Sequence, residues 1–189
     1  MGLDIFLVTD NTAELDTAEY LTGDLRQQHR LSRTFCNFMC RQYVVEGEAE
    51  LEQIAKLVKL DLAIFHEMEL YADEYAISEM LEEASTGAER ERIRVQIQEA
   101  NAKCENNIDR LLTTVETLIQ RLSGMPDLPS QLNDHGSDTL NNNRYFARLP
   151  EAAGSTYFDN SFLQDLGNMK SFIEYAKSKG SRTVYFHIG

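Results

Sequence analysis

The sequence predicts a mainly α-helical fold with a minor β part (α+β), a helical bundle around one long helix (residues 89–122) with a small sheet from the N- and C-terminal strands. The first observation is an apolar residue at every third or fourth position, the pattern of an amphipathic helix. These positions are Ile93, Ile97, Ala100, Cys104, Ile108, Leu111, Val115, Leu118 and Leu122. Second, Thr86 and Glu89 have capping-box spacing, and Ser123-Gly124 before Pro126 is a stop signal. Third, the clear strand-forming segments are at the two ends of the chain.

The N-terminal half contains a strand and three further predicted helices. Residues 3–8 are rich in strand formers and are followed by the turn signal Thr9-Asp10-Asn11. Residues 23–45 and 48–60 each place apolar side chains at helical spacing. Asp61 can cap a third helix over residues 62–84, and the short connection at 85–87 predicts that this helix packs antiparallel to the long one.

The C-terminal third differs in composition. Residues 124–160 contain all three prolines and several turn clusters, which predicts a long irregular segment with at most a short strand at 156–158. Asn160 can cap a last helix over 161–178, with Phe162, Leu166, Met169 and Ile173 inward, and Gly180 is suited to end it. Residues 182–188 alternate as a strand. We expect one domain over residues 1–189.

Negative charge is concentrated in the first half of the chain. The net charge is −13, and residues 46–83 contain 12 acidic side chains but only two basic ones, Lys56 and Lys59. A field of one sign repels nucleic-acid phosphates and attracts basic proteins. We therefore expect a basic protein partner and no direct contact with nucleic acid. The candidate docking face comprises Glu67, Glu74, Glu79, Glu82 and Glu83.

Several classes of protein are disfavoured by composition. No apolar run has membrane-spanning length, so no membrane association is expected. The first residues lack the basic start of a secretion signal, which favours a cytoplasmic protein. Three cysteines, an odd number, fit reduced thiols better than a disulfide framework. The chain has no glycine-rich phosphate loop, nucleophile elbow or Cys-x-x-Cys pair, and we expect no cofactor.

Two groups of residues are weak candidates for binding a metal. His66, Glu69 and Asp73 share a helix face at three- and four-residue spacing, although the zinc-protease motif would need a histidine where Leu70 stands. A solvated acidic face is the preferred interpretation. Cys36 and Cys40 lie one helical turn apart without a second pair, so core packing is preferred for them and for Cys104. The loop at 133–138 is better explained by turn chemistry than as a calcium site.

An arginine line lies on the polar side of residues 23–45, formed by Arg26, Arg30, Arg33 and Arg41. It could contact nucleic acid, but pairing with the acidic stretch that follows is the preferred interpretation. The opening Met-Gly-Leu-Asp, the segment 31–40 and the closing segment 179–186 resemble a group of small uncharacterised bacterial proteins. No activity is attached to that group, so the resemblance implies nothing about chemistry.

Three functional hypotheses follow. The leading one is a non-catalytic acidic module that docks a basic partner, such as an antagonist of a nucleic-acid-binding protein or an immunity-type inhibitor of a basic toxin. The second is a metal-dependent enzyme that uses His66 and nearby acids, with residues 134–138 as a lid or ligand. The third is a structural or adaptor subunit whose charge serves solubility.

Overall fold

A computed structural model describes residues 4–17, 20, 23–125, 127–133, 145–147 and 160–189. The elements in chain order are β1 (Ile5–Thr9), α1 (Thr12–Leu15), α3 (Asp24–Gln28), α4 (Arg33–Cys40), η1 (Arg41–Tyr43), α5 (Glu50–Val58), α6 (Ala63–Glu69), α7 (Glu74–Glu83), α8 (Gly87–Cys104), α9 (Ile108–Ser123), η2 (Pro129–Gln131), α10 (Phe162–Ser178) and β2 (Val184–Ile188). The predicted fold class, mainly helical with a small terminal sheet, is confirmed. No helix of these described segments is long and apolar enough to cross a membrane.

The two terminal strands form an antiparallel pair in which Ile5 lies opposite Ile188 and Thr9 opposite Val184. The second edge of β2 is closed by the turn that joins α8 to α9. The Asn107 side chain accepts a hydrogen bond from the Val184 backbone N–H at 2.9 Å and donates one to the Val184 carbonyl at 2.8 Å. One amide side chain thus replaces a neighbouring strand and satisfies backbone groups that burial would otherwise leave unpaired.

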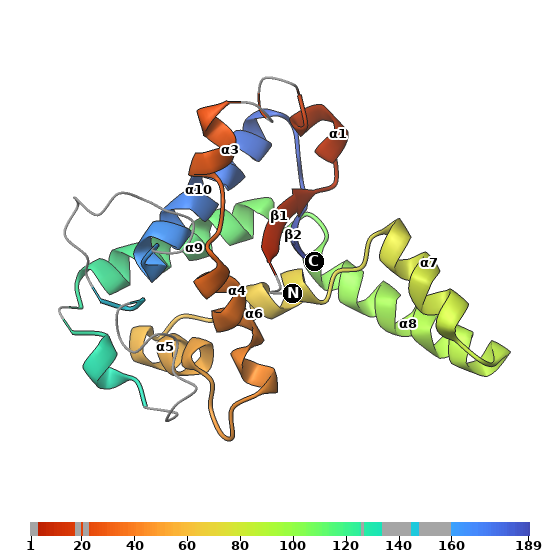
Figure 1. Ribbon diagram of the computed structural model, residues 1–189, viewed down its shortest axis with the longest axis horizontal. Helices are drawn as coiled ribbons and strands as arrows, with labels where there is room; N and C mark the ends of the chain where they lie inside the picture. Colours follow the sequence, from red (N-terminus) through yellow and green to blue (C-terminus); the bar gives the residue numbers. More distant parts are fainter. Residues whose placement is uncertain (1–3, 18–19, 21–22, 126, 134–144, 148–159) are drawn as a thin grey trace.

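The core lies between the sheet and helices α4, α5, α6, α9 and α10, which surround it in Figure 1. Helices α9 and α10 pack along each other, and their fully buried side chains include Leu111, Leu118, Leu166 and Met169. The buried stripe recurs every three or four residues, so each helix presents one apolar side to the core.

A buried carboxylate joins the start of α10 to the start of α4. Asp165 is fully buried and accepts hydrogen bonds from the backbone N–H and hydroxyl of Ser32 and from Tyr145 and Asn160. Burial nevertheless raises the pKa of Asp165, because desolvation outweighs the four bonds, which lower it. Its bonds to Ser32 and Tyr145 join α10 to the start of α4 and to the segment at residue 145, so this cluster holds distant parts of the chain together.

The long helix predicted over 89–122 is wrong as a single helix. It is two helices, α8 and α9, separated at residues 105–107, where Asn106 has φ of 55°. Asparagine tolerates this left-handed conformation better than most residues. At the break, the Asn106 N–H donates to the Thr183 hydroxyl and the Ile108 N–H donates to the Arg182 carbonyl. These bonds to the residues just before β2 replace the helical hydrogen bonds that a continuous helix would make.

Two other predicted helices are also divided. The segment 62–84 contains α6 and α7, because Asp73 caps α7 by accepting the Ala76 N–H at 2.9 Å. The segment 23–45 contains α3, α4 and η1, because the Ser32 side chain caps α4 and is itself bound to Asp165. In both cases a capping side chain starts a new helix inside a continuous apolar pattern.

Other predictions agree with the structure. Helix α10 matches the predicted 161–178, its four predicted inward residues are buried, and Gly180 follows it at φ of 88°. Its cap is Ser161, which forms a capping box with Gln164, rather than the predicted Asn160. Helix α5 matches 48–60. The predicted strand at 156–158 and the loop at 134–138 lie outside the described residues.

Candidate functional site

Helices α7 and α8 form an antiparallel hairpin, the arm, that extends to one side of the molecule (Figure 1). The connection is short, and the start of α8 is capped locally. The Thr86 hydroxyl accepts the Glu89 N–H at 3.1 Å, and the Glu89 carboxylate accepts the Ser85 N–H at 2.9 Å. The predicted antiparallel packing is therefore confirmed for the α7 half of the predicted third helix. The predicted capping box is only half formed, because the Glu89 carboxylate accepts from Ser85 and not from the N-cap residue Thr86.

The arm buries very little of its own apolar surface. No residue of α7 is buried, and Cys104 is the single buried residue of α8. Four large apolar side chains of the arm and its junction are exposed, Leu70 at 59%, Tyr75 at 75%, Met80 at 47% and Val95 at 46%. Isolated exposed apolar residues are common in soluble proteins, but a group of them marks an interaction surface.

A groove of about 900 Å³ lies between the arm and α6. Its lining residues are Ala63, His66, Glu67 and Leu70 from α6 and its end, Ala72 from the junction, Met80, Glu83 and Ala84 from α7 and its end, and Glu89, Ile93, Gln96, Ile97, Glu99, Ala100 and Lys103 from α8. The first half of the predicted apolar stripe, Ile93 to Ala100, thus lines an open groove instead of the core. This volume is in the range of ligand sites in proteins.

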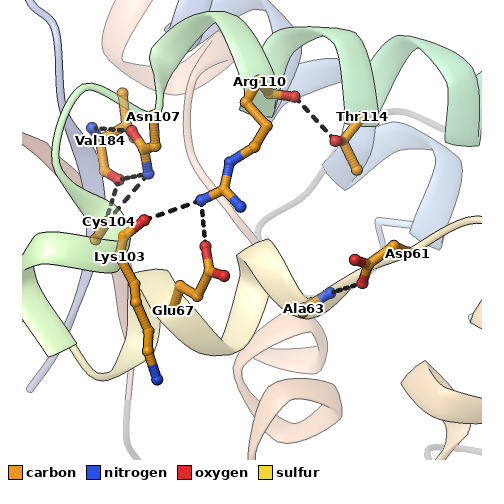
Figure 2. Close-up of polar contacts among 9 residues, drawn as sticks. All are labelled: Asp61, Ala63, Glu67, Lys103, Cys104, Asn107, Arg110, Thr114 and Val184. Atoms are coloured by element: carbon orange, nitrogen blue, oxygen red, sulfur yellow. Dashed lines mark hydrogen bonds and ion pairs between the residues drawn. The ribbon is translucent and has the colours of Figure 1, made fainter. Parts of the chain in front are cut away.

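Two polar side chains, Asn101 and Arg110, fix the base of the arm. The Asn101 side chain accepts the Ala72 N–H at 2.9 Å and donates to the Ala72 carbonyl at 2.8 Å, which joins α8 to the start of the arm. Figure 2 shows Arg110 of α9 between Glu67 of α6 and the Lys103 carbonyl, to which it donates at 3.0 Å. These contacts set the separation of α6 and α8, and therefore the shape of the groove.

The five predicted docking acids divide into two groups. Glu67 lies on α6 and pairs with Arg110, so its charge is compensated. Glu74, Glu79, Glu82 and Glu83 are all exposed on α7, and none of them forms an ion pair within the described part of the chain. Of the predicted face, only the α7 group therefore presents uncompensated charge on the arm.

The predicted metal candidates are only partly brought together. His66 Nε2 lies 3.0 Å from Glu52 Oε1, and its Nδ1 lies 3.7 Å from Glu69 Oε2, beyond hydrogen-bond distance. Asp73 instead caps α7. The nearby Glu69 carboxylate raises the pKa of His66, followed by the bond to Glu52, against an opposing effect of burial. The described residues contain no cluster of three or more His, Cys, Asp or Glu suited to a metal.

The three cysteines are free thiols. Burial raises the pKa of Cys36 and of Cys104 to about 12, so both remain protonated at neutral pH and are poor nucleophiles and metal ligands. Cys36 and Cys40 lie close together, whereas Cys104 contacts Asn107 and Val184 near β2. Cys36 and Cys104 are core residues, as predicted, and Cys40 is half-buried beside that core.

The arginine line is divided by the break before α4. Arg33 pairs with Asp4, and Arg41 forms a buried ion pair with Glu50 at 3.2 Å. The predicted pairing with the acidic stretch is thus seen for Arg41. Among the residues that the structure describes, the acids of α7 form no ion pair with these arginines.

Sequence reasoning missed the residues that shape the groove, Asn101 and Arg110, and the residue that joins the turn before α9 to β2, Asn107. Asn101, Asn107 and Arg110 make their decisive contacts with residues at least 29 positions away. The available signal was the pair Asn106-Asn107 inside an apolar stripe, since asparagine is a weak helix former that favours turns. Comparison with protein-family models, curated proteins and solved structures gave no match.

Proposed function

We propose that this protein is a non-catalytic binding protein whose acidic arm docks a basic protein partner. The observation that supports this function is the uncompensated charge of α7. Glu74, Glu79, Glu82 and Glu83 are exposed, the helix contains no basic residue, and no ion pair within the described residues neutralises these four. Like charges on one helix repel each other by a few tenths of a kcal/mol per pair. A basic partner would relieve this repulsion and would itself be attracted to the four carboxylates.

The small buried area of the arm supports the same function. A helix usually gains its stability from packing an apolar face, yet α7 buries no residue. Tyr75 and Met80 remain exposed beside the acids. A partner that covers them would add apolar burial to electrostatic attraction, the combination found at protein interfaces.

The test is capture of a partner from cell lysate by the wild-type protein and by a variant with Glu74, Glu79 and Glu82 changed to lysine. Glu67 is left intact because it pairs with Arg110. The matched control changes Glu14, Asp24 and Asp127, three exposed acids away from the arm, to lysine. Each variant has the same change in net charge. We expect a basic protein to bind the wild type and the control but not the arm variant.

Salt provides a second measurement on the same complex. Exposed charges act over about 8 Å at physiological ionic strength, so higher salt should slow association of the wild-type complex. A complex that is indifferent to salt and to the arm reversal would exclude this function. Equal loss in the arm variant and the control would show that total charge, not the arm, attracts the partner.

A further inference from the structure

The walls of the groove restrict what can occupy it. All three are helices, α6, α7 and α8, whose backbone groups are largely hydrogen-bonded internally. An extended peptide placed there would find few backbone partners and would bury unpaired N–H and C=O groups. A helix brings its own backbone hydrogen bonds and needs only an apolar face. The groove therefore fits a helix better than a strand.

The floor of the groove has the periodicity of a helix-binding surface. Ile93, Ile97 and Ala100 lie about one turn apart along α8 and are only half-buried. Leu70 and Met80 add apolar surface from the two other walls. From Glu89 to Lys103 the lining runs for about 21 Å at a rise of about 1.5 Å per residue, which corresponds to roughly four turns of a bound helix.

Charge differs between the two ends of the groove. Glu83 and Glu89 lie near the connection of the arm, and Glu99 lies further along α8. His66 and Lys103 lie at the base, where Arg110 compensates Glu67. The outer end therefore attracts basic side chains, and the base tolerates an acidic one. The positive end of a helix macrodipole, its N-terminus, also favours the acidic outer end.

We infer that the groove binds an amphipathic helix of the partner, parallel to α8, with basic residues at its N-terminal half and an acidic residue near its C-terminus. This inference rests on the proposed function, because it identifies how the basic partner would dock. A second copy of this chain is the competing occupant, and its binding would appear as a change in oligomeric state.

The probe is a synthetic amphipathic helix of about 15 residues, long enough for four turns. It has leucines and one tryptophan on the apolar face, lysines in the first half and glutamates in the last turn. Because this protein contains no tryptophan, the fluorescence of the peptide reports its binding alone. A second peptide has the same composition with the charges exchanged end for end. We expect a blue shift and saturable binding for the first peptide, and affinity lower by about tenfold for the second.

Matched variants locate the binding surface. In the groove variant, Glu83 and Glu99, which line the groove, are changed to lysine. In the outer variant, Glu74 and Glu82, which lie outside the lining, are changed to lysine. Ile97→Glu is compared with Val95→Glu, since Val95 is exposed outside the lining. We expect the groove variants to weaken binding of the isolated helix by about tenfold or more. The outer variants should weaken it by less than about threefold, because Glu74 and Glu82 lie outside the groove and would contact the rest of the partner, which the peptide lacks.

The possible outcomes separate this inference from the proposed function. If the Glu83/Glu99 variant and the Glu74/Glu82 variant weaken peptide binding equally, the groove assignment is overturned and acidic docking stays intact. Failure of the peptide to bind, with a lysate partner still lost on arm reversal, would overturn the helical occupant alone. If neither variant affects either ligand, both proposals fail. Sedimentation showing a dimer of the unliganded protein that Ile97→Glu dissociates would assign the groove to a second copy instead.

Discussion

Helices α8 and α9 carry two halves of one apolar stripe but bury it very differently. In α9 the stripe from Ile108 to Leu122 is buried throughout. In α8 the equivalent positions Ile93, Ile97 and Ala100 are half-exposed, and Cys104 alone is buried. Equal spacing thus identifies the apolar side of a helix without revealing whether other elements cover it.

The difference follows from the neighbours of each helix. Helix α9 packs along α10 and also contacts α5, so its apolar side faces the core. Helix α8 is covered by α7 on one side and by α6 near its base, which leaves the groove open between them. The α9 half of the stripe stabilises the fold, and the α8 half is available to a partner.

The largest difference between the two helices is expected when the same charge is placed in each half of the apolar stripe. Leu111→Asp puts a carboxylate at a fully buried position, which costs several kcal/mol, a large part of the about 5–15 kcal/mol that stabilises a typical domain. Ile93→Asp places it at the half-exposed groove, where water still solvates it. We expect Leu111→Asp to unfold the protein and Ile93→Asp to change its melting temperature little, as measured by circular dichroism.

A folded Leu111→Asp protein would show that the α9 stripe is not the core. An Ile93→Asp protein as unstable as the first would show that α8 is packed as tightly as α9, and the groove would not exist.

The position of the break between the two helices was the main feature that sequence did not predict. The cap at Thr86 and the stop at Gly124 depend on local spacing, and both agree with the structure. The stripe is buried as predicted only in its α9 half. The turn at Asn106-Asn107 depends on bonds to residues 182–184, which are distant in sequence. Local patterns cannot report such a competition between helix continuity and strand pairing.

The second prediction tests that turn. Asn107→Ala removes both side-chain bonds to Val184 and leaves the buried backbone groups of the strand unpaired, at about 1–3 kcal/mol for such a group. We expect a lower melting temperature and faster hydrogen exchange at the Val184 amide. Asn106→Gly is the control, because glycine adopts the same left-handed φ without strain. If the Val184 amide exchanges at the wild-type rate in Asn107→Ala, the turn does not hold the strand.

Local sequence patterns also fail to distinguish buried from exposed acidic residues. The acids of α7 were predicted as exposed because their charge is concentrated in sequence. Asp165 was not identified, although it is fully buried, because its partners Ser32 and Tyr145 are 133 and 20 positions away. Nothing in the spacing around residue 165 distinguishes it from an exposed helical acid.

The third prediction uses pH to compare the core with the arm. Since burial raises the pKa of Asp165 above its value in the unfolded chain, the folded state binds this proton more tightly. Its contribution to stability is therefore complete below pH 3.8 and is lost as pH rises through the raised pKa. Asp165→Asn should remove this step, because an amide can still accept from Ser32 N–H and donate to the two hydroxyls. Thermal unfolding at several pH values compares the two proteins, and parallel profiles would contradict the prediction.

The smallest expected effect is at His66, whose side chain is 28% exposed at the groove. Its pKa is raised, first by the nearby Glu69 carboxylate and then by the bond to Glu52, against the opposing effect of burial. The protonated ring therefore stabilises the folded state below pH 6.5, and this contribution is lost as pH rises through the raised pKa. His66→Gln should flatten the stability profile there by a small amount, because water screens a partly exposed pair. NMR titration of the His66 ring gives its pKa directly. A value below 6.5 would show that burial outweighs both carboxylates, and that the base of the groove carries no positive charge from His66 at neutral pH.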